Sequence, residues 1–220
     1  MNAEIEHQAR VDATIMYFQE REIQCVDFEE YVGHESVKQP DLLLPTFNTL
    51  IEVKTFAPQE QEIKEAQRIG KELTEGKVSA YWHPTFYDRF GDHLRSARHK
   101  FRVYSTYHTV VLFYDLHAFT HEQTPEDLLR GQEYFEFAHL KADPKQVVQV
   151  GYGRNNRQVR QDMNTEIGAV VFHTGHDAFK IFHNHFADKI RRIDKRIFPL
   201  SRDQHFEYID DSVEPKIMRL

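Results

Sequence analysis

The sequence has little of the features that mark several classes of protein. Cys25 is the only cysteine in the 220 residues, so neither a disulfide framework nor a zinc site built on cysteines is available. No apolar run comes near the roughly 20 residues that a membrane-spanning helix needs. The N-terminus lacks a basic segment followed by an apolar one, which is the pattern of a secretory signal. These absences favour a cytoplasmic protein with no membrane partner.

Linkers are missing as well. No stretch is rich enough in glycine, serine and proline to separate two domains, and no segment repeats another. What is present is ordinary for a globular chain, with 40% hydrophobic and 29% charged residues. The 17 phenylalanines and 10 tyrosines argue against disorder. We therefore expect residues 1–220 to form a single domain.

Charge is not in excess on the positive side, as it usually is in proteins that bind nucleic acid non-specifically. The formal net charge is −7, from 28 basic and 35 acidic residues. The basic residues nevertheless gather at 89–102, 154–160 and 189–196, and the acidic ones at 60–75 and 203–214. Any one such stretch is typical of a solvated face, but a basic stretch can also bind phosphate locally.

Hydrophobic periodicity predicts a mixed α/β fold (the α+β class) around one central sheet. The order along the chain is helix, three strands, two helices, a strand, and then further strands. A polar tail at 199–220 is expected to be loosely held. The expected helices cover 4–21, 58–73, 88–103 and 187–197, and the expected strands cover 24–32, 40–44, 49–56, 109–116, 134–138, 167–173 and 178–183.

The segment from Pro40 to Lys54 is the most informative part of the sequence. If its two strands form an antiparallel hairpin closed by four residues, Leu44 faces Thr49 and Asp41 faces Glu52. Residues opposite one another in such a pair have Cβ atoms about 4.5–5.5 Å apart. Lys54 lies two residues beyond Glu52 and therefore projects from the same face of the strand. The neighbouring Ile51 and Val53 point to the opposite, apolar face.

Two opposed carboxylates repel one another, and a sheet gains nothing from them. A divalent cation between Asp41 and Glu52 would remove the repulsion. Mg²⁺ prefers oxygen ligands and commonly takes only one or two carboxylates from the protein. Such an ion activates water and neutralises charge on phosphate oxygens, and a neighbouring lysine can orient the water. The spacing therefore predicts a metal-centred phosphodiester site.

These residues also match a known pattern. Pro40-Asp41, followed after ten residues by Glu52-Val53-Lys54, resembles the motif of the PD-(D/E)xK nuclease family. The resemblance covers about the first half of the chain and implies a restriction-endonuclease-like core over about 4–116. Residues 117–198 are expected to form a C-terminal elaboration of that core. It implies that Asp41 and Glu52, with the Val53 carbonyl, bind Mg²⁺ or Mn²⁺, and that Lys54 is the catalytic lysine. It also implies a nuclease whose substrate is nucleic acid, most simply a DNA endonuclease.

The same resemblance suggests two further positions. Many family members place an acidic residue on the first helix, facing the metal; Asp12 is the preferred candidate here and Glu20 the alternative, and a surface carboxylate is an equally good interpretation of Asp12. Some members carry a glutamine on the helix after the Glu-x-Lys strand. Gln67 is suitably placed, but the aromatic residue expected four positions later is replaced by Lys71.

Two basic segments are candidates for holding the nucleic acid. The helix at 88–103 presents Arg95 and Arg98 at helical spacing, followed by His99 and Arg102. The segment at 151–157 contains Arg154, Asn155 and Arg157 after two glycines, a composition that suits contacts with phosphates and bases. Both segments could equally be solvated surface.

Histidine is plentiful, with 14 residues, and four of them crowd one region. A zinc site is the alternative metal centre that these residues allow. No His-Glu-x-x-His helix is present, however, so a structural role is the favoured interpretation of this group. The four residues are His173, His176, His183 and His185.

A second function remains open. The chain could keep the nuclease fold and serve as a catalytically silent module that binds nucleic acid or a partner protein. The net charge and the acidic tail favour this alternative, while the Asp41–Glu52 pair disfavours it. A homodimer is also possible, because cleavage of both strands of a duplex is simplest with two sites related by symmetry.

Overall fold

The protein is described by a computed structural model. Its described residues are 3–33, 38–55, 64, 67, 68, 71, 75, 84–114, 133–137, 147–152, 164–173, 179–198, 204–208 and 217–219. Within these ranges, no helix is both long enough and apolar enough to cross a membrane.

One mixed sheet organises the described part of the chain, with eight strands in the order β1-β2-β3-β4-β7-β8-β9-β10. β1, β2 and β3 form an antiparallel meander, and β4 and β7 run parallel to β3. β8 is antiparallel to β7, β9 is parallel to β8, and β10 is antiparallel to β9. The strands are β1 (Val26–Asp27), β2 (Leu42–Leu44), β3 (Thr49–Thr55), β4 (His108–Tyr114), β7 (Ala169–His173), β8 (Phe179–Asn184), β9 (Gln204–Tyr208) and β10 (Ile217–Arg219).

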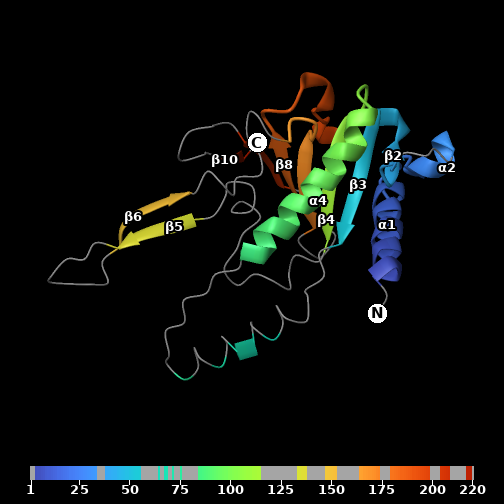
Figure 1. Cartoon of the computed structure of the whole chain (residues 1–220). Helices are drawn as coiled ribbons and strands as arrows, with labels where there is room; N and C mark the ends of the chain where they lie inside the picture. The colour runs from blue at the N-terminus through green and yellow to red at the C-terminus, as the bar shows by residue number, and fades with distance from the viewer. Residues whose placement is uncertain are drawn as a thin grey trace.

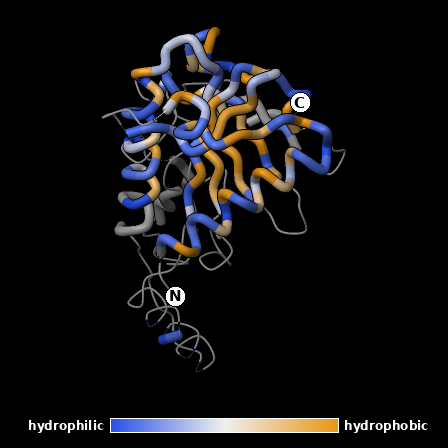
Figure 2. The backbone as a smooth tube through the Cα atoms, turned by 90° about the vertical axis from the view of Figure 1, so that its right-hand side faces the viewer, coloured by the Kyte–Doolittle hydropathy of each residue, from blue (hydrophilic) through white to orange (hydrophobic). Residues whose placement is uncertain are grey.

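The central strands are apolar because both of their faces are covered. The helices α1 (Ala3–Gln19) and α4 (Pro84–Val103) pack on opposite faces, and Figure 1 shows α4 crossing in front of β3 and β4. Figure 2 shows the hydrophobic strands in the middle of the fold with more polar segments around them. Helix α4 contributes Phe90, Leu94, Ala97 and Phe101 to the cluster on its side of the sheet. Helix α1 contributes Val11, Tyr17 and Phe18 to the cluster on the other side.

The two faces of β3 belong to different clusters. Ile51 and Val53 are fully buried in the α1-side cluster, while Leu50 is buried in the α4-side cluster. Because side chains alternate along a strand, Glu52 and Lys54 project to the same side as Leu50, beneath α4. The predicted division of β3 into two faces is thus confirmed, and it places the polar face under α4.

The described elements of residues 3–114 follow the predicted order of helix, three strands, two helices and strand, apart from the first of the two predicted helices and an unpredicted short helix between the first two strands. One strand was placed wrongly. Of the segment 24–32 only Val26–Asp27 is a strand, and a short helix, α2 (Phe28–Val32), follows it. The reason is local, because the Asp27 side chain accepts a hydrogen bond from Glu30 N over 3.0 Å and caps the helix. The predicted helix at 58–73 lies mostly outside the described residues.

The C-terminal half departs further from expectation. Strands β5 (Glu133–Phe137) and β6 (Val147–Tyr152) form a separate antiparallel pair, although β6 was not predicted. The expected helix at 187–197 is replaced by two 3₁₀ turns, η4 (Lys189–Arg191) and η5 (Lys195–Ile197). The tail expected to be loosely held contributes β9 and β10 to the main sheet. The strands β9 and β10 form because they pair with β8 and with each other.

Candidate functional site

The hairpin that carries the site has the register predicted from the sequence. Leu44 pairs with Thr49, and Leu42 pairs with Ile51. The turn between them is the 3₁₀ turn η1 (Pro45–Phe47), closed by Asn48 in the left-handed region at φ 47°. Asparagine tolerates this conformation better than most residues. The ladder ends at Leu42, so Asp41 lies one residue beyond it, level with Glu52.

Asp41 is anchored to the strands on both of its sides. Its carboxylate Oδ2 accepts a hydrogen bond from Val53 N over 2.7 Å. Its backbone carbonyl accepts one from Phe28 N over 3.1 Å. In a strand, the N–H and C=O of one residue point to the same side. The Val53 carbonyl therefore also points toward Asp41, past the beginning of β2.

Glu52 is completely buried and is contacted by two lysines. Lys54 Nζ lies 2.6 Å from its Oε1, and Lys100 Nζ, from α4, lies 2.7 Å from Oε1 and 2.8 Å from Oε2. Lys100 Nζ is also 3.7 Å from Asp41 Oδ1. One ammonium group thus lies within ion-pair distance of both carboxylates, one from each strand of the hairpin.

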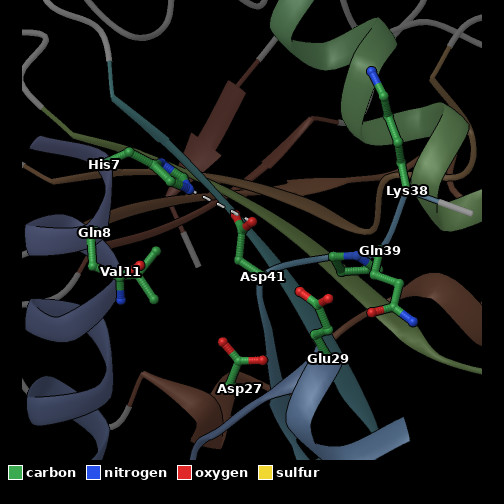
Figure 3. A pocket seen from close by; sticks show the side chains of 9 residues that line it. His7, Gln8, Val11, Asp27, Glu29, Lys38, Gln39 and Asp41 are labelled. Atoms are coloured by element: carbon green, nitrogen blue, oxygen red, sulfur yellow. Dashed lines mark ion pairs between the residues drawn. The ribbon is translucent and has the colours of Figure 1, made fainter. Parts of the chain in front are cut away.

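The first helix contributes a histidine to this group. His7 Nε2 lies 3.7 Å from Asp41 Oδ1, and Figure 3 shows the ring directed toward that carboxylate. The interaction with Asp41 raises the pKa of His7. Burial alone would raise the pKa of Asp41, but His7, Lys100 and the Val53 amide outweigh it and hold the pKa below its usual value. Asp41 is therefore the more readily ionised of the two carboxyl groups.

The pKa of Glu52 is shifted in the opposite direction, above its usual value. Its burial raises the pKa, the charge of Asp41 raises it further, and the two lysines act against both effects. His93 on α4 lies near Lys54, and burial together with that positive charge lowers its pKa to about 4. The cluster of Asp41, Glu52 and the two lysines, which we call the centre, is thus a largely buried group of opposite charges, where electrostatic interactions are stronger than in water.

Two pockets meet at this cluster. The first, which we call the acidic pocket, has a volume of about 350 Å³, and its wall includes His7, Asp27, Glu29 and Asp41 (Figure 3). The second, which we call the cationic pocket, has a volume of about 460 Å³ and lies along α4. It is lined by Lys38, Asp92, Arg95, Ser96, His99 and Lys100. Lys38 lines both pockets.

The predicted acidic partner on the first helix was wrong. Asp12 is exposed and accepts a hydrogen bond from Gln8 Nε2 over 2.9 Å, so it does not face the centre. Glu20 is also exposed, 3.6 Å from Arg21. The reason is that α1 packs on the face of β3 opposite to Glu52, and only its first turns reach Asp41. Gln67 is exposed, and among the described residues it has no contact with Asp41, Glu52 or Lys54.

The candidate nucleic-acid residues separate from one another. Arg95 lines the cationic pocket. Arg98 acts electrostatically on Glu166, together with Arg102. Arg154, Asn155 and Arg157 lie outside the described residues.

The histidine-rich region has structural contacts where it is described. His183 Nε2 and His205 Nδ1 are 3.0 Å apart, and His205 Nε2 lies 3.2 Å from the Phe198 carbonyl. Since that carbonyl can only accept, His205 donates to it through Nε2 and accepts from His183 through Nδ1. The ring of His173 packs against Tyr114 and Phe179. His176 lies outside the described residues.

Sequence reasoning missed two members of the site, Lys100 and His7. Lys100 pairs with a carboxylate 48 positions earlier, so no local spacing announces it. The one available signal was its position on the helix beside the buried Ala97 and Phe101, at the edge of the face that covers the sheet. His7 similarly precedes the buried Val11 by one helical turn.

In the parts of the chain that the structure describes, no group of three or more His, Cys, Asp or Glu side chains that could hold a metal ion is found. The protein-derived ligands available at the centre are the Asp41 and Glu52 carboxylates and the Val53 carbonyl. Comparison of the chain with family models, with curated proteins and with solved structures gives no match.

Proposed function

We propose that the chain is a Mg²⁺-dependent nuclease that hydrolyses phosphodiester bonds in DNA, with its centre at Asp41, Glu52, Val53 and Lys54. One observation carries the proposal. Carboxylates from two adjoining strands converge on a single ammonium group, Lys100 Nζ, at 2.7 Å from Glu52 and 3.7 Å from Asp41. A position between two carboxylates that attracts an ammonium group also suits a divalent cation that takes its place.

The donor atoms fit a small, hard divalent ion. Mg²⁺ takes oxygen ligands, usually keeps several waters, and needs only one or two carboxylates from the protein. The Asp41 and Glu52 oxygens and the Val53 carbonyl, which points to the same side as Asp41, meet that requirement. Such a small set also explains why a third acidic or imidazole ligand is not required. When bound, the ion would neutralise phosphate charge and lower the pKa of a water ligand.

The chain's own residues would then position the reactants. Lys54, held 2.6 Å from Glu52 and mostly buried, can orient the attacking water and stabilise negative charge on the phosphate oxygens. Water adds to phosphorus and gives up a proton to solvent, the ester P–O bond breaks, and the departing oxygen takes up a proton from solvent. His7 holds Asp41 in place through the contact described above.

The arrangement of residues 3–114 supports the same proposal. Its described elements, a helix and three strands that precede α4 and the parallel strand β4, are compatible with the restriction-endonuclease-like core that the resemblance to PD-(D/E)xK nucleases implies. Asp41 lies at the level where β2 begins and lines the acidic pocket, and Lys100, which contacts both carboxylates, lines the cationic pocket. Glu52 is itself buried and adjoins the two pockets through these residues.

The test is cleavage of plasmid and oligonucleotide DNA with Mg²⁺ or Mn²⁺, against a chelator control. We expect Asp41→Asn, Glu52→Gln and Lys54→Met each to lower the cleavage rate by about 100-fold or more. Lys189→Met, which removes an exposed lysine from η4, is the matched control and should cleave like the wild type. Variants of Asp41 and Lys54 that fold and cleave normally would overturn the proposal.

The alternative, a catalytically silent binding module, has one observation in its favour. Lys54 and Lys100 already match the charge of Glu52, so the carboxylate needs no metal for its stability. Calorimetric titration with Mn²⁺ discriminates the two functions. Binding that is abolished by Asp41→Asn favours the nuclease, whereas no binding, together with DNA binding by the wild type, favours the module.

A further inference from the structure

The cationic pocket on α4 stands out in a protein with an excess of acidic residues. Lys38, Arg95 and Lys100 bring three positive charges to a wall that holds one carboxylate, that of Asp92. Asp92 is paired with Arg95 at 2.7 Å on the exposed side of the helix. The lining of the pocket is therefore mostly cationic even though the chain has a net charge of −7, although Arg95 shares its charge with Asp92 and Lys100 shares its charge with Glu52 and Asp41.

The pocket adjoins the proposed catalytic centre through one shared side chain. Lys100 lines the pocket and, through its Nζ, contacts both Glu52 and Asp41. Figure 3 shows that Lys38 extends from the loop before Asp41 toward α4, so its amine lies on the side of the cationic pocket. An anion held there would lie within one side-chain length of the two carboxylates.

The opposite side of Asp41 has the opposite charge. The acidic pocket exposes Asp27, Glu29 and Asp41, with His7 and Lys38 at its rim. A phosphate on that side would meet like charge. The two pockets thus differ in sign on the two sides of the same carboxylate, and only one of them suits a polyanion.

We propose that the cationic pocket is a phosphate subsite, formed by Lys38, Arg95, Ser96 and His99 beside Lys100, which binds the phosphodiester next to the one that is cleaved. The proposal rests on the nuclease function proposed above and deepens it. Arginine binds phosphate through two parallel hydrogen bonds, lysine binds it as a point charge, and the Ser96 hydroxyl can donate to it. The substrate class is therefore a chain with a phosphate on one side of the scissile bond, rather than an isolated phosphodiester.

The test compares two substrates of different length. Bis(p-nitrophenyl) phosphate has a single phosphodiester and no neighbour, whereas a DNA oligonucleotide has phosphates on either side of each bond. We expect Lys38→Ala and Arg95→Ala each to raise KM for the oligonucleotide about tenfold and to leave KM and kcat for the small substrate unchanged. Lys189→Met, which removes an exposed lysine that does not line the pocket, is the control and should change neither.

Binding is measured in parallel by fluorescence anisotropy with labelled DNA, in Ca²⁺, over a range of salt concentrations. Each variant should weaken binding and reduce the slope of log K against log salt by about one unit or less, as the loss of one phosphate contact requires. Equal KM effects on both substrates, or oligonucleotide binding like that of the wild type, would overturn the subsite.

The two proposals fail in different ways. If the wild type binds DNA through Lys38 and Arg95 but does not cleave it, the nuclease function falls and the pocket is a phosphate-binding site without a neighbouring scissile bond. If the wild type cleaves DNA and the pocket variants cleave it equally well, the nuclease function stands and the subsite falls. Circular dichroism of each variant checks that its fold is intact.

Discussion

At the scale of single residues, the position of Lys100 has the sharpest consequence. Its ammonium group lies between the two carboxylates that are proposed to bind a metal ion. A divalent ion entering there must displace this charge or be repelled by it, and charges a few ångströms apart interact by several kcal/mol in a partly buried site. Lys100 would therefore compete with the proposed metal ion for the two carboxylates.

We predict that Lys100→Met raises the affinity for Mn²⁺ by about tenfold or more, because the competing charge is removed. Isothermal titration calorimetry measures the effect, and Arg102→Gln on the same helix serves as the control. The same substitution should weaken DNA binding, since Lys100 also lines the cationic pocket. Unchanged or weaker Mn²⁺ binding by Lys100→Met would contradict the place assigned to the ion.

Cys25 gives a second prediction at this scale. The residue is 6% exposed, and burial raises the pKa of its thiol to about 12. The thiolate is the reactive form, so almost none of it is present near neutral pH. We expect a thiol reagent such as Ellman's reagent to react very slowly with the native protein at pH 8 and rapidly in urea. Because Cys25 is the only cysteine, the colour yield reports this position alone; rapid reaction of the native protein would show that the burial is wrong.

Individual site residues were predictable to the extent that local periodicity determines them. The alternation of Ile51, Glu52, Val53 and Lys54 gives the face of each side chain, and the length of the turn gives the register with Asp41. Lys100 could not be predicted in the same way. Its partner depends on where α4 crosses β3, which is set by the packing of Phe90, Leu94 and Phe101 against the face of the sheet that α4 covers and not by any spacing in the sequence.

At the scale of elements, the C-terminal end of α4 is held by a buried arginine. Arg191 is 4% exposed and donates to the carbonyls of Phe101 and Tyr104 at 3.1 and 2.8 Å. Cations at this end of a helix also interact favourably with its dipole. The backbone of Arg191 lies so close to Gly168 that a Cβ on the glycine would be only 1.7 Å from the Arg191 carbonyl oxygen. The end of α4 and the start of β7 are thus locked together.

We predict that Arg191→Met lowers the free energy of unfolding by about 3 kcal/mol, because buried carbonyl oxygens lose hydrogen bonds from a charged donor. Urea denaturation followed by circular dichroism measures the change. The control is Arg196→Met, which removes an exposed arginine that pairs with Asp194 and should have an effect within about 0.5 kcal/mol. Equal stability of the two variants would show that the cap at α4 contributes little.

The elements themselves were predictable where a hydrophobic pattern is strong and long. Helices α1 and α4 and strands β3, β4, β7 and β8 follow from such patterns. The prediction of a strand over 24–32 was wrong because Asp27 caps a short helix there, although the residues around it favour a strand. Strands β9 and β10 were not predicted, because their segments are polar and become strands only by pairing with β8 and with each other.

At the scale of the whole molecule, stability should depend on pH through His183. Its pKa is lowered to about 4, first by burial and then by the nearby His205 and Lys195. The unfolded chain, in which histidine titrates near 6.5, takes up a proton between those values before the folded protein does. Folding stability contributed by this residue is therefore present above pH 6.5 and is lost as the pH falls toward 4.

We predict that this single group costs about 2 kcal/mol of stability between pH 7 and pH 5, which amounts to a fall of several degrees in the melting temperature. In His183→Gln the fall over the same interval should be smaller by that amount. The exposed His185 provides the control, because His185→Gln should retain the pH dependence of the wild type. Differential scanning calorimetry at the two pH values measures all three proteins. A pH dependence unaltered by His183→Gln would refute the assignment.

Strand β3 has one further consequence for the molecule as a whole. It is paired with β2 on one side and β4 on the other, and it is covered by helices on both faces. Such a strand opens only when the entire domain does, so its amide hydrogens belong to the slowest-exchanging class. We therefore expect Glu52 and Lys54 to be among the least mobile of the described residues. Heat should abolish their arrangement at the temperature of global melting and not before, and the centre should reassemble whenever the chain refolds.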